Sequence, residues 1–277
     1  MGEVFEILSN RLIRKRAWRV YWRSFGWILL ASIVILALEA VLINFPSSIV
    51  FTAIMNANVD SEVIRTLGNS MNIARQMVLH FVFSPVLIGG AFLFAARLWH
   101  GERARIGSLF GMVCRAPRVW AVDLVISLAT YLPALIGLAI PLGFILVDAF
   151  VGTKAVVAIV LAMILMLTLM FVFSMRLSLA TGCMVLDDGL TAIGCIRTSW
   201  RASKSHLWRI FCHALISSIP FIAAIIAANA IRSDVFFYTS APGFICYSGA
   251  MLLARLAHIY ILLANVGLTE QLTRESD

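Results

Sequence analysis

Residues 25–45 read FGWILLASIVILALEAVLINF, a run of 21 residues in which Glu39 is the single ionisable side chain. About 20 apolar residues are enough to carry an α-helix across the hydrocarbon core of a bilayer. Five further stretches have the same character, namely residues 76–98, 119–140, 155–173, 207–228 and 243–266. The sequence therefore predicts an all-α, polytopic membrane helix bundle with six transmembrane helices.

The composition of the whole chain agrees with this fold class. Of the 277 residues, 61% are hydrophobic and 13% are charged, and this charged fraction is about half of that in a soluble domain. A soluble fold of this length could not bury so much apolar surface without leaving large exposed patches. These values exclude an ordinary soluble enzyme, a disordered chain and a small disulfide-stapled module.

The third apolar stretch is longer than a bilayer requires. The chain is nearly continuously apolar from Val119 to Phe150, and one helix of that length would measure about 48 Å. We therefore expect a break or a strong tilt, with Pro133 and Pro141 as the places for a break.

The distribution of positive charge predicts the orientation in the membrane. Of the 22 Lys and Arg residues, 18 lie in the N-terminal segment, in the loops after the second and fourth stretches, or in the sixth stretch and the tail. The four on the opposite side are Arg65, Arg75, Lys154 and Arg232. Cytoplasmic loops carry the excess of Lys and Arg, so both termini are expected in the cytoplasm. This bias also explains the net charge of +8, and no nucleic-acid partner is expected.

Residues 1–277 are expected to form one integral membrane domain, with the bundle over 25–266 and a cytoplasmic tail over 267–277. Residues 1–23 predict a cytoplasmic helix lying on the bilayer, with interfacial aromatic residues at its end: Trp18, Tyr21, Trp22 and Trp27. The external segment 46–75 carries apolar residues at helical spacing and is expected to fold onto the outer surface.

Two more surface helices are expected in the cytoplasmic loops. Residues 104–114 place Ile106, Leu109, Phe110 and Val113 at helical spacing. Residues 190–203 form the second such helix, with Asp188 as its expected N-cap. Its expected apolar face is Leu190, Ile193, Ile196 and Trp200, and its opposite face is Arg197, Arg201 and Lys204. Arg197, Arg201, Lys204 and Trp200 are the candidate surface for anionic lipid headgroups or a membrane-protein partner.

The three surface helices give the chain a second interpretation. Each helix precedes a pair of apolar stretches, so the chain could consist of three copies of one unit, a surface helix followed by a helix hairpin. The entries to the odd-numbered stretches are faintly similar, for example RAWRV at 16–20 and RAPRV at 115–119. The alternative is that every boundary between cytoplasm and membrane gathers basic and aromatic residues.

Residues 173–209, FSMRLSLATGCMVLDDGLTAIGCIRTSWRASKSHLWR, resemble the membrane domain of bacterial glycerophosphoryl diester phosphodiesterases and related uncharacterised six-span inner-membrane proteins. The residues that fit the pattern are Arg176, Asp187, Ser199, Trp200, Trp208 and Arg209, whereas Gly182 stands where the family usually has Pro. The resemblance implies a bacterial inner-membrane location. It transfers no catalytic residues, and phosphodiesterase activity is not expected because the soluble catalytic domain of those relatives does not follow.

Ionisable side chains inside membrane helices are costly and are functional candidates by default. The candidate polar site is Arg255, His258, Glu39 and Asp123. Arg255 lies near the middle of the sixth stretch, with His258 one turn away and either Glu39 or Asp123 as its partner. The pair would either line a polar cavity or be purely structural. The other histidines, including His80 and His213, are expected to be structural.

No catalytic, cofactor-binding or metal-binding motif is present in the sequence. The function expected first is a non-enzymatic organising, anchoring or accessory membrane protein that contacts anionic lipid. The alternative is a small transporter with a polar site around Arg255. A lipid-modifying enzyme, with groups near Asp187 or Asp123, is the third.

Overall fold

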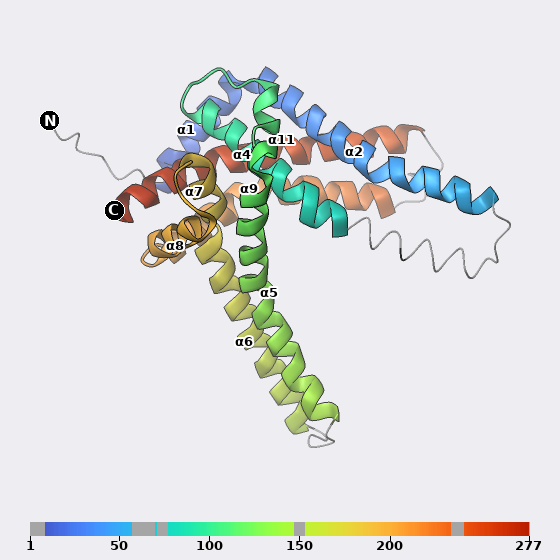
Figure 1. Cartoon of the computed structure of the whole chain (residues 1–277), viewed down its shortest axis with the longest axis vertical. Coiled ribbons are helices and arrows are strands. Elements are labelled where there is room, and N and C mark those ends of the chain that lie inside the picture. The colour runs from blue at the N-terminus through green and yellow to red at the C-terminus, as the bar shows by residue number, and fades with distance from the viewer. Residues whose placement is uncertain (1–8, 57–69, 71–76, 147–152, 234–240, 277) are drawn as a thin grey trace. The chain divides into compact units, whose positions relative to one another are not determined.

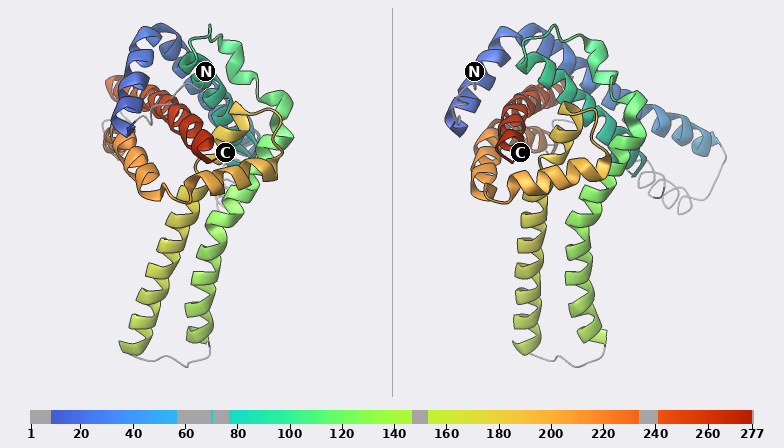
Figure 2. Two further views of the ribbon diagram at one scale, coloured as in Figure 1. Left: turned by 90° about the vertical axis from the view of Figure 1, so that its left-hand side faces the viewer. Right: turned by 60° about the vertical axis from the view of Figure 1, so that its left-hand side comes forward.

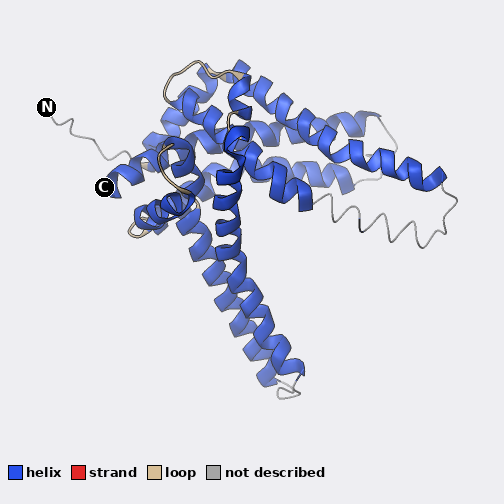
Figure 3. Ribbon diagram, in the orientation of Figure 1, coloured by secondary structure: helices blue, strands red, loops and turns tan. Residues whose placement is uncertain are grey.

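The computed structural model of the chain describes residues 9–56, 70, 77–146, 153–233 and 241–276 (Figure 1). Within these ranges the ordered elements are helices, and none of the described residues forms a strand (Figure 3). The predicted all-α class is confirmed.

Four helical segments are long and apolar enough to cross a membrane: Leu79–Trp99, Ile159–Leu186, Leu207–Ile231 and Ile245–Glu275. A fifth is counted if the bent pair Asn10–Arg23 and Phe25–Val41 is one span. The remaining predicted stretch, residues 119–140, is also helical. The structure thus agrees with a helical membrane protein, and a total of six spans stays a prediction.

Helix α5, Ala116–Leu146, corrects the expectation of a break in the third stretch. It runs through Pro133 and Pro141 as one helix of 31 residues. A helix of this length measures about 47 Å. If α5 crosses the membrane, it must therefore be strongly tilted, which was the other expectation.

The chain divides into two compact units. The first unit comprises Met1–Ala116 and His213–Leu268, and the second comprises Pro117–Cys212 and Thr269–Asp277. Helices α9, Leu207–Ser233, and α11, Ala241–Ser276, begin in one unit and end in the other.

In the first unit, α1 (Asn10–Arg23) meets α2 (Phe25–Asn56) at an angle of 84°. The described part of the predicted N-terminal segment is helical, and its position on the cytoplasmic face of a bilayer stays a prediction. Ile13, Ala17 and Tyr21 form the buried face of α1, because residues four positions apart share one side of a helix. Trp18, Trp22 and Trp27 are about half exposed, whereas Tyr21, expected at the interface with them, is buried.

The expected helix at 104–114 is wrong. This segment instead forms two short 3₁₀ turns, η2 (Ile106–Phe110) and η3 (Val113–Arg115). Leu109 is 2% exposed, and its backbone lies so close to Gly90 of α4 (Ser84–Trp99) that a Cβ at Gly90 would overlap its carbonyl. Gly107 and Gly111 disfavour a helix here, and the contact at Gly90 requires a buried turn.

Three predicted units would each need a surface helix, and the structure has an α-helix in two of these places and 3₁₀ turns in the third. The threefold repeat therefore stays a prediction. Most of the external segment 46–75 lies outside the described residues, apart from the end of α2 and Ser70.

In the second unit, α5 and α6 (Thr153–Leu177) run side by side in both views of Figure 2. A short helix not foreseen from the sequence, α7 (Ala180–Leu186), follows α6. It leads into α8 (Ala192–Ser203), the predicted surface helix. The N-cap of α8 is Thr191, whose hydroxyl accepts a hydrogen bond from the Gly194 amide, and not Asp188 as expected.

The expected apolar face of α8 is also wrong. Its buried residues are Cys195, Ser199, Ala202 and Ser203, whereas Ile193 is 76% exposed and Trp200 is 40% exposed. Small side chains let α8 approach α6 and α7 closely. The Ser199 hydroxyl donates to the Arg176 carbonyl near the end of α6, where carbonyls lack partners within their own helix. The Ser203 hydroxyl is within hydrogen-bond distance of the same carbonyl and of the Trp200 carbonyl.

Candidate functional site

Glu39 continues the buried stripe of α2. Ile28 and Ser32 are fully buried and Ile35 is 7% exposed. Glu39 follows at the same spacing of about four residues, so it points in the same direction as these three. A carboxylate on the packed side of an apolar helix needs a partner within the protein.

Helix α11 supplies that partner. Ala254 and Ile259 are buried, and Arg255 and His258 lie between them on the part of α11 that faces a cavity. The sequence places Arg255 near the middle of this long helix.

Arg255 and Glu39 form an ion pair, with Arg255 Nη2 and Glu39 Oε2 2.5 Å apart. Each side chain keeps 25% of its surface exposed. Arg255 Nε is buried and makes no hydrogen bond within the described part of the chain. The guanidinium therefore holds Glu39 through one nitrogen and retains an unused donor.

A π-helical turn forms another wall of the site. The turn η1 spans Leu79–Phe83, and Pro85 follows at the start of α4. Proline has no N–H to donate to the carbonyl four residues earlier, so the series of backbone hydrogen bonds along the helix is interrupted at this point. Single π turns are frequent at functional sites. Here the turn carries His80 and Phe83, both of which line the cavity.

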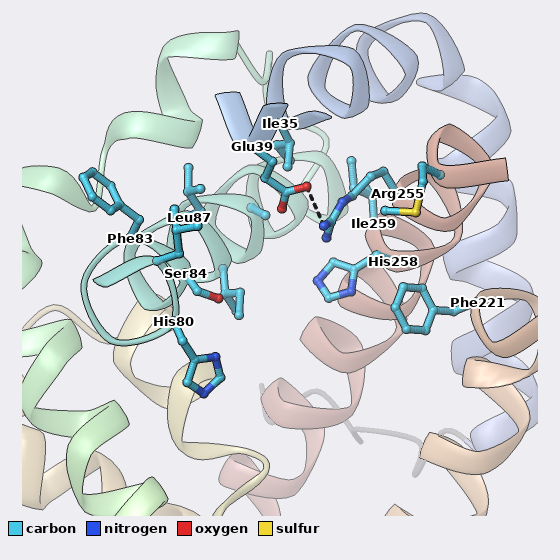
Figure 4. Close-up of a pocket in the computed structure, with 14 residues that line it drawn as sticks. Ile35, Glu39, His80, Phe83, Ser84, Leu87, Phe221, Arg255, His258 and Ile259 are labelled. Carbon is cyan, nitrogen blue, oxygen red and sulfur yellow. Dashed lines mark hydrogen bonds and ion pairs between the residues drawn. The ribbon is translucent and has the colours of Figure 1, made fainter. Parts of the chain in front are cut away.

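The cavity between these elements has a volume of about 530 Å³. Figure 4 shows Glu39 and Arg255 pointing toward one another, with His258 beside Arg255 and Phe221 next to His258. The ring centroids of Phe221 and His258 are 5.7 Å apart. The polar side chains lining the cavity are Glu39, His80, Ser84, Arg255 and His258. The rest of its lining is apolar, with Ile35, Leu79, Phe83, Leu87, Ile88, Ala91, Phe221, Met251 and Ile259.

Of the two carboxylates considered as partners of Arg255, the structure pairs Glu39. Asp123 is half-buried on α5 in the second unit and is not among the residues that line the cavity. Sequence reasoning did not foresee His80, Ser84 and Phe221 in this site. For His80, the one signal in the sequence was Pro85, five residues later, because a proline disturbs the preceding helical turn.

Several contacts hold α8 against the end of α6. Ser199 Oγ donates to the Arg176 carbonyl at 2.7 Å, and the Arg176 guanidinium lies 4.6 Å from the ring centre of Trp200. Arg118 donates to the carbonyls of Asp187 and Asp188 at 2.8 and 3.0 Å. Arg176, Ser199 and Trp200 thus take part in the packing of the second unit.

On the other side of α8, Arg197, Arg201, Lys204 and Trp200 are all exposed. The structure therefore leaves this candidate surface open. Trp200 lies on the same side as the cations and not opposite to them.

Among the described residues, no group of three His, Cys, Asp or Glu side chains is placed to hold a metal ion. Comparison of the chain with protein-family models, with curated proteins and with solved structures finds no match.

Proposed function

We propose that this chain is a small transport or carrier protein of the membrane that binds an amphiphilic molecule with an anionic head group at Arg255. One observation carries the proposal. The Arg255–Glu39 ion pair lines a cavity of about 530 Å³, and the walls of this cavity come from α2 and from three helices that are long and apolar enough to cross a membrane.

The size and lining of the cavity support a small ligand. Pockets for small molecules measure about 300–1,000 Å³ and have apolar walls with a few polar groups that orient the ligand. Ionisable side chains inside membrane segments are costly, and substrate and ion pathways are among the features that they mark. An acyl or other apolar tail would fit against Leu87, Ile88 and Phe221, with the head group at Arg255.

The state of Arg255 supports an anionic head. Glu39 occupies one nitrogen of the guanidinium, and Nε has no partner within the described residues. A planar guanidinium can hold a carboxylate or phosphate through two parallel hydrogen bonds. In this proposal Glu39 compensates the charge of Arg255 while the cavity is empty and gives way when an anion enters.

The number of spans, the orientation and the membrane are proposed from the sequence. Six spans, cytoplasmic termini and a bacterial inner membrane are part of the proposal, supported by the positive-charge bias and by the family resemblance. No enzymatic activity is proposed.

Thiol labelling tests whether water reaches the cavity. Met251→Cys places a thiol in the cavity wall, and Leu253→Cys places one on a residue of the same helix that is 61% exposed and does not line the cavity. Both are made in a chain with Cys114, Cys212 and Cys246 changed to Ala. In bilayer discs, a charged thiosulfonate should modify Met251→Cys and leave Leu253→Cys unmodified. Equal reactivity at the two positions would reject the proposal.

Native mass spectrometry after extraction into polymer discs tests for the ligand itself. The parent chain should retain a defined amphiphile, and Arg255→Gln should lose it. The matched control is Arg274→Gln, because Arg274 also pairs with a glutamate, Glu270, but does not line the cavity. Retention of the same molecule by Arg255→Gln would contradict the assignment.

The organising or accessory role is the second candidate. It is favoured by the α5–α6 hairpin, because none of the most apolar window of Ile159–Leu186 is buried within the protein. A helix that is apolar all round needs either lipid or a partner helix. Capture of a stoichiometric membrane protein in the same discs, with no bound amphiphile, would favour this role. A lipid-modifying enzyme stays the third candidate.

A further inference from the structure

The outward side of α8 combines positive charge with large apolar side chains. We call Ile193, Arg197, Trp200, Arg201 and Lys204 the α8 outer face. Their spacing of three or four residues places them on one stripe of the helix, and all five are exposed, Ile193 to 76%.

The opposite side of α8 is fixed within the second unit. Ser199 donates to the Arg176 carbonyl at 2.7 Å, and Cys195 and Ala202 are buried. Trp200 is held as well, with the Arg176 guanidinium 4.6 Å from its ring centre and Phe173 at 5.6 Å. The outer face is therefore presented by a helix that cannot turn to bury it.

The charge of the outer face is uncompensated within the described part of the chain. Residues 192–204 contain no Asp or Glu. None of the ion pairs formed between described residues involves Arg197, Arg201 or Lys204. Three cations on a short helix, with Ile193 and Trp200 on the same stripe, complement a surface that is anionic and has an apolar layer just beneath.

Chain connectivity fixes the level at which this face lies. The apolar segment Ile159–Leu186 is long enough to cross a membrane, and α8 begins at Ala192, six residues after its end. So short a connection holds α8 at the end of that segment. Trp, Arg and Lys at this level are typical of the boundary between lipid and water.

We propose that the α8 outer face is a docking site for anionic phospholipid headgroups. Arg197, Arg201 and Lys204 bind the headgroup phosphates, while Ile193 and Trp200 insert beside the upper acyl chains. This is the arrangement of an interfacial helix whose binding combines charge with apolar burial. The inference concerns the second unit and does not depend on the cavity at Arg255.

Photocrosslinking in the full chain tests the site and leaves every native cysteine in place. Ile193 is replaced by the photoreactive residue p-benzoylphenylalanine, and the protein is placed in discs with equal amounts of phosphatidylglycerol and phosphatidylcholine. The matched control carries the same residue at Leu253, 61% exposed within a candidate span. Mass spectrometry then gives the ratio of the two lipids in the adducts.

The adducts at Ile193 should favour phosphatidylglycerol about fivefold or more over those at Leu253, since each cation near an anionic surface contributes about that factor. R197Q/R201Q/K204Q should remove the preference, and 0.5 M salt should weaken it. A ratio at Ile193 equal to that at Leu253, adducts to protein in place of lipid, or an unchanged ratio in the triple variant would each overturn the proposal.

A second measurement covers the case in which the photoreactive variant does not fold. Native mass spectrometry of the parent chain and the triple variant, from the same mixed discs, counts retained phosphatidylglycerol directly. The triple variant alters exposed side chains and should unfold at the same temperature as the parent. Equal retention of phosphatidylglycerol by the two chains would also overturn the proposal.

Discussion

Arg255 and Glu39 lie 216 positions apart in the sequence, yet Nη2 of the first and Oε2 of the second are 2.5 Å apart inside the first unit. Removing one partner leaves the other charge without compensation. We expect Arg255→Met to lower the free energy of unfolding by about 3 kcal/mol, at the low end for buried pairs because each side chain keeps a quarter of its surface exposed. Unfolding of the protein in lipid discs measures this.

The double variant separates the ion pair from simple packing. Arg255→Met with Glu39→Leu should come within about 1 kcal/mol of the parent, because no charge remains in the cavity wall. Arg274→Met, which breaks the more exposed pair with Glu270, should cost less than about 1 kcal/mol. If the loss in free energy of unfolding of the double variant equals the sum of the losses of the two single variants, the two charges act independently.

Gly90 of α4 lies directly against the backbone of the turn η2. A Cβ at this position would overlap the backbone carbonyl of Leu109, and a backbone atom cannot move aside as a flexible side chain can. Gly90→Ala should therefore destabilise the protein by at least about 2 kcal/mol.

The matched control for Gly90 is Gly249, also within a long helix. A Cβ at Gly249 meets nothing within 4 Å, so Gly249→Ala should be neutral or stabilise by up to about 1 kcal/mol. Thermal unfolding of both variants in the same discs gives the comparison. A stable Gly90→Ala variant would mean that η2 does not pack on α4 as described.

Ser199 ties α8 to the end of α6 through the Arg176 carbonyl. Ser199→Ala leaves this carbonyl to Ser203, whose hydroxyl is 3.3 Å away. We expect a loss of about 1 kcal/mol and faster hydrogen exchange of the α8 amides. Ser178→Ala, which removes an exposed bond to the Met175 carbonyl, is the control. Similar exchange in the two variants would contradict the role of Ser199.

Arg118 closes the turn between α7 and α8 by donating to the carbonyls of Asp187 and Asp188. Lysine cannot reproduce the fork of a guanidinium. Arg118→Lys should speed hydrogen exchange at residues 187–191 about tenfold, whereas Arg97→Lys, an exposed change on α4, should have no effect there. Unchanged exchange in Arg118→Lys would show that the turn is held by other contacts.

The parts of the fold that sequence reasoning reached are those set by composition and by single costly residues. Long apolar runs predicted the helices, because few other structures satisfy the backbone in lipid. Arg255 and Glu39 were found because charges in such runs are rare. Arg255 pairs with Glu39 and not with Asp123 because of which helices pack together. The sequence pattern within one helix does not contain that information.

The errors concern short helices whose packing departs from the apolar-inside rule. On α8, the hydroxyl groups of Ser199 and Ser203 are buried because they bond to a helix end, and Ile193 is left outside. At 104–114, the apolar spacing suggested a helix, but the close approach of Leu109 to Gly90 selected a turn. Both outcomes depend on residues far away in the sequence.

The π turn at Leu79–Phe83 holds one residue more than the α-helical turn that it replaces. Deletion of one of residues 81–83 would let the helix close up regularly ahead of Pro85, leaving the packing of α4 on η2 in place and rotating His80 around the helix axis by about 100°. Deletion of one codon could thus change the shape of the cavity without weakening the packing of the bundle.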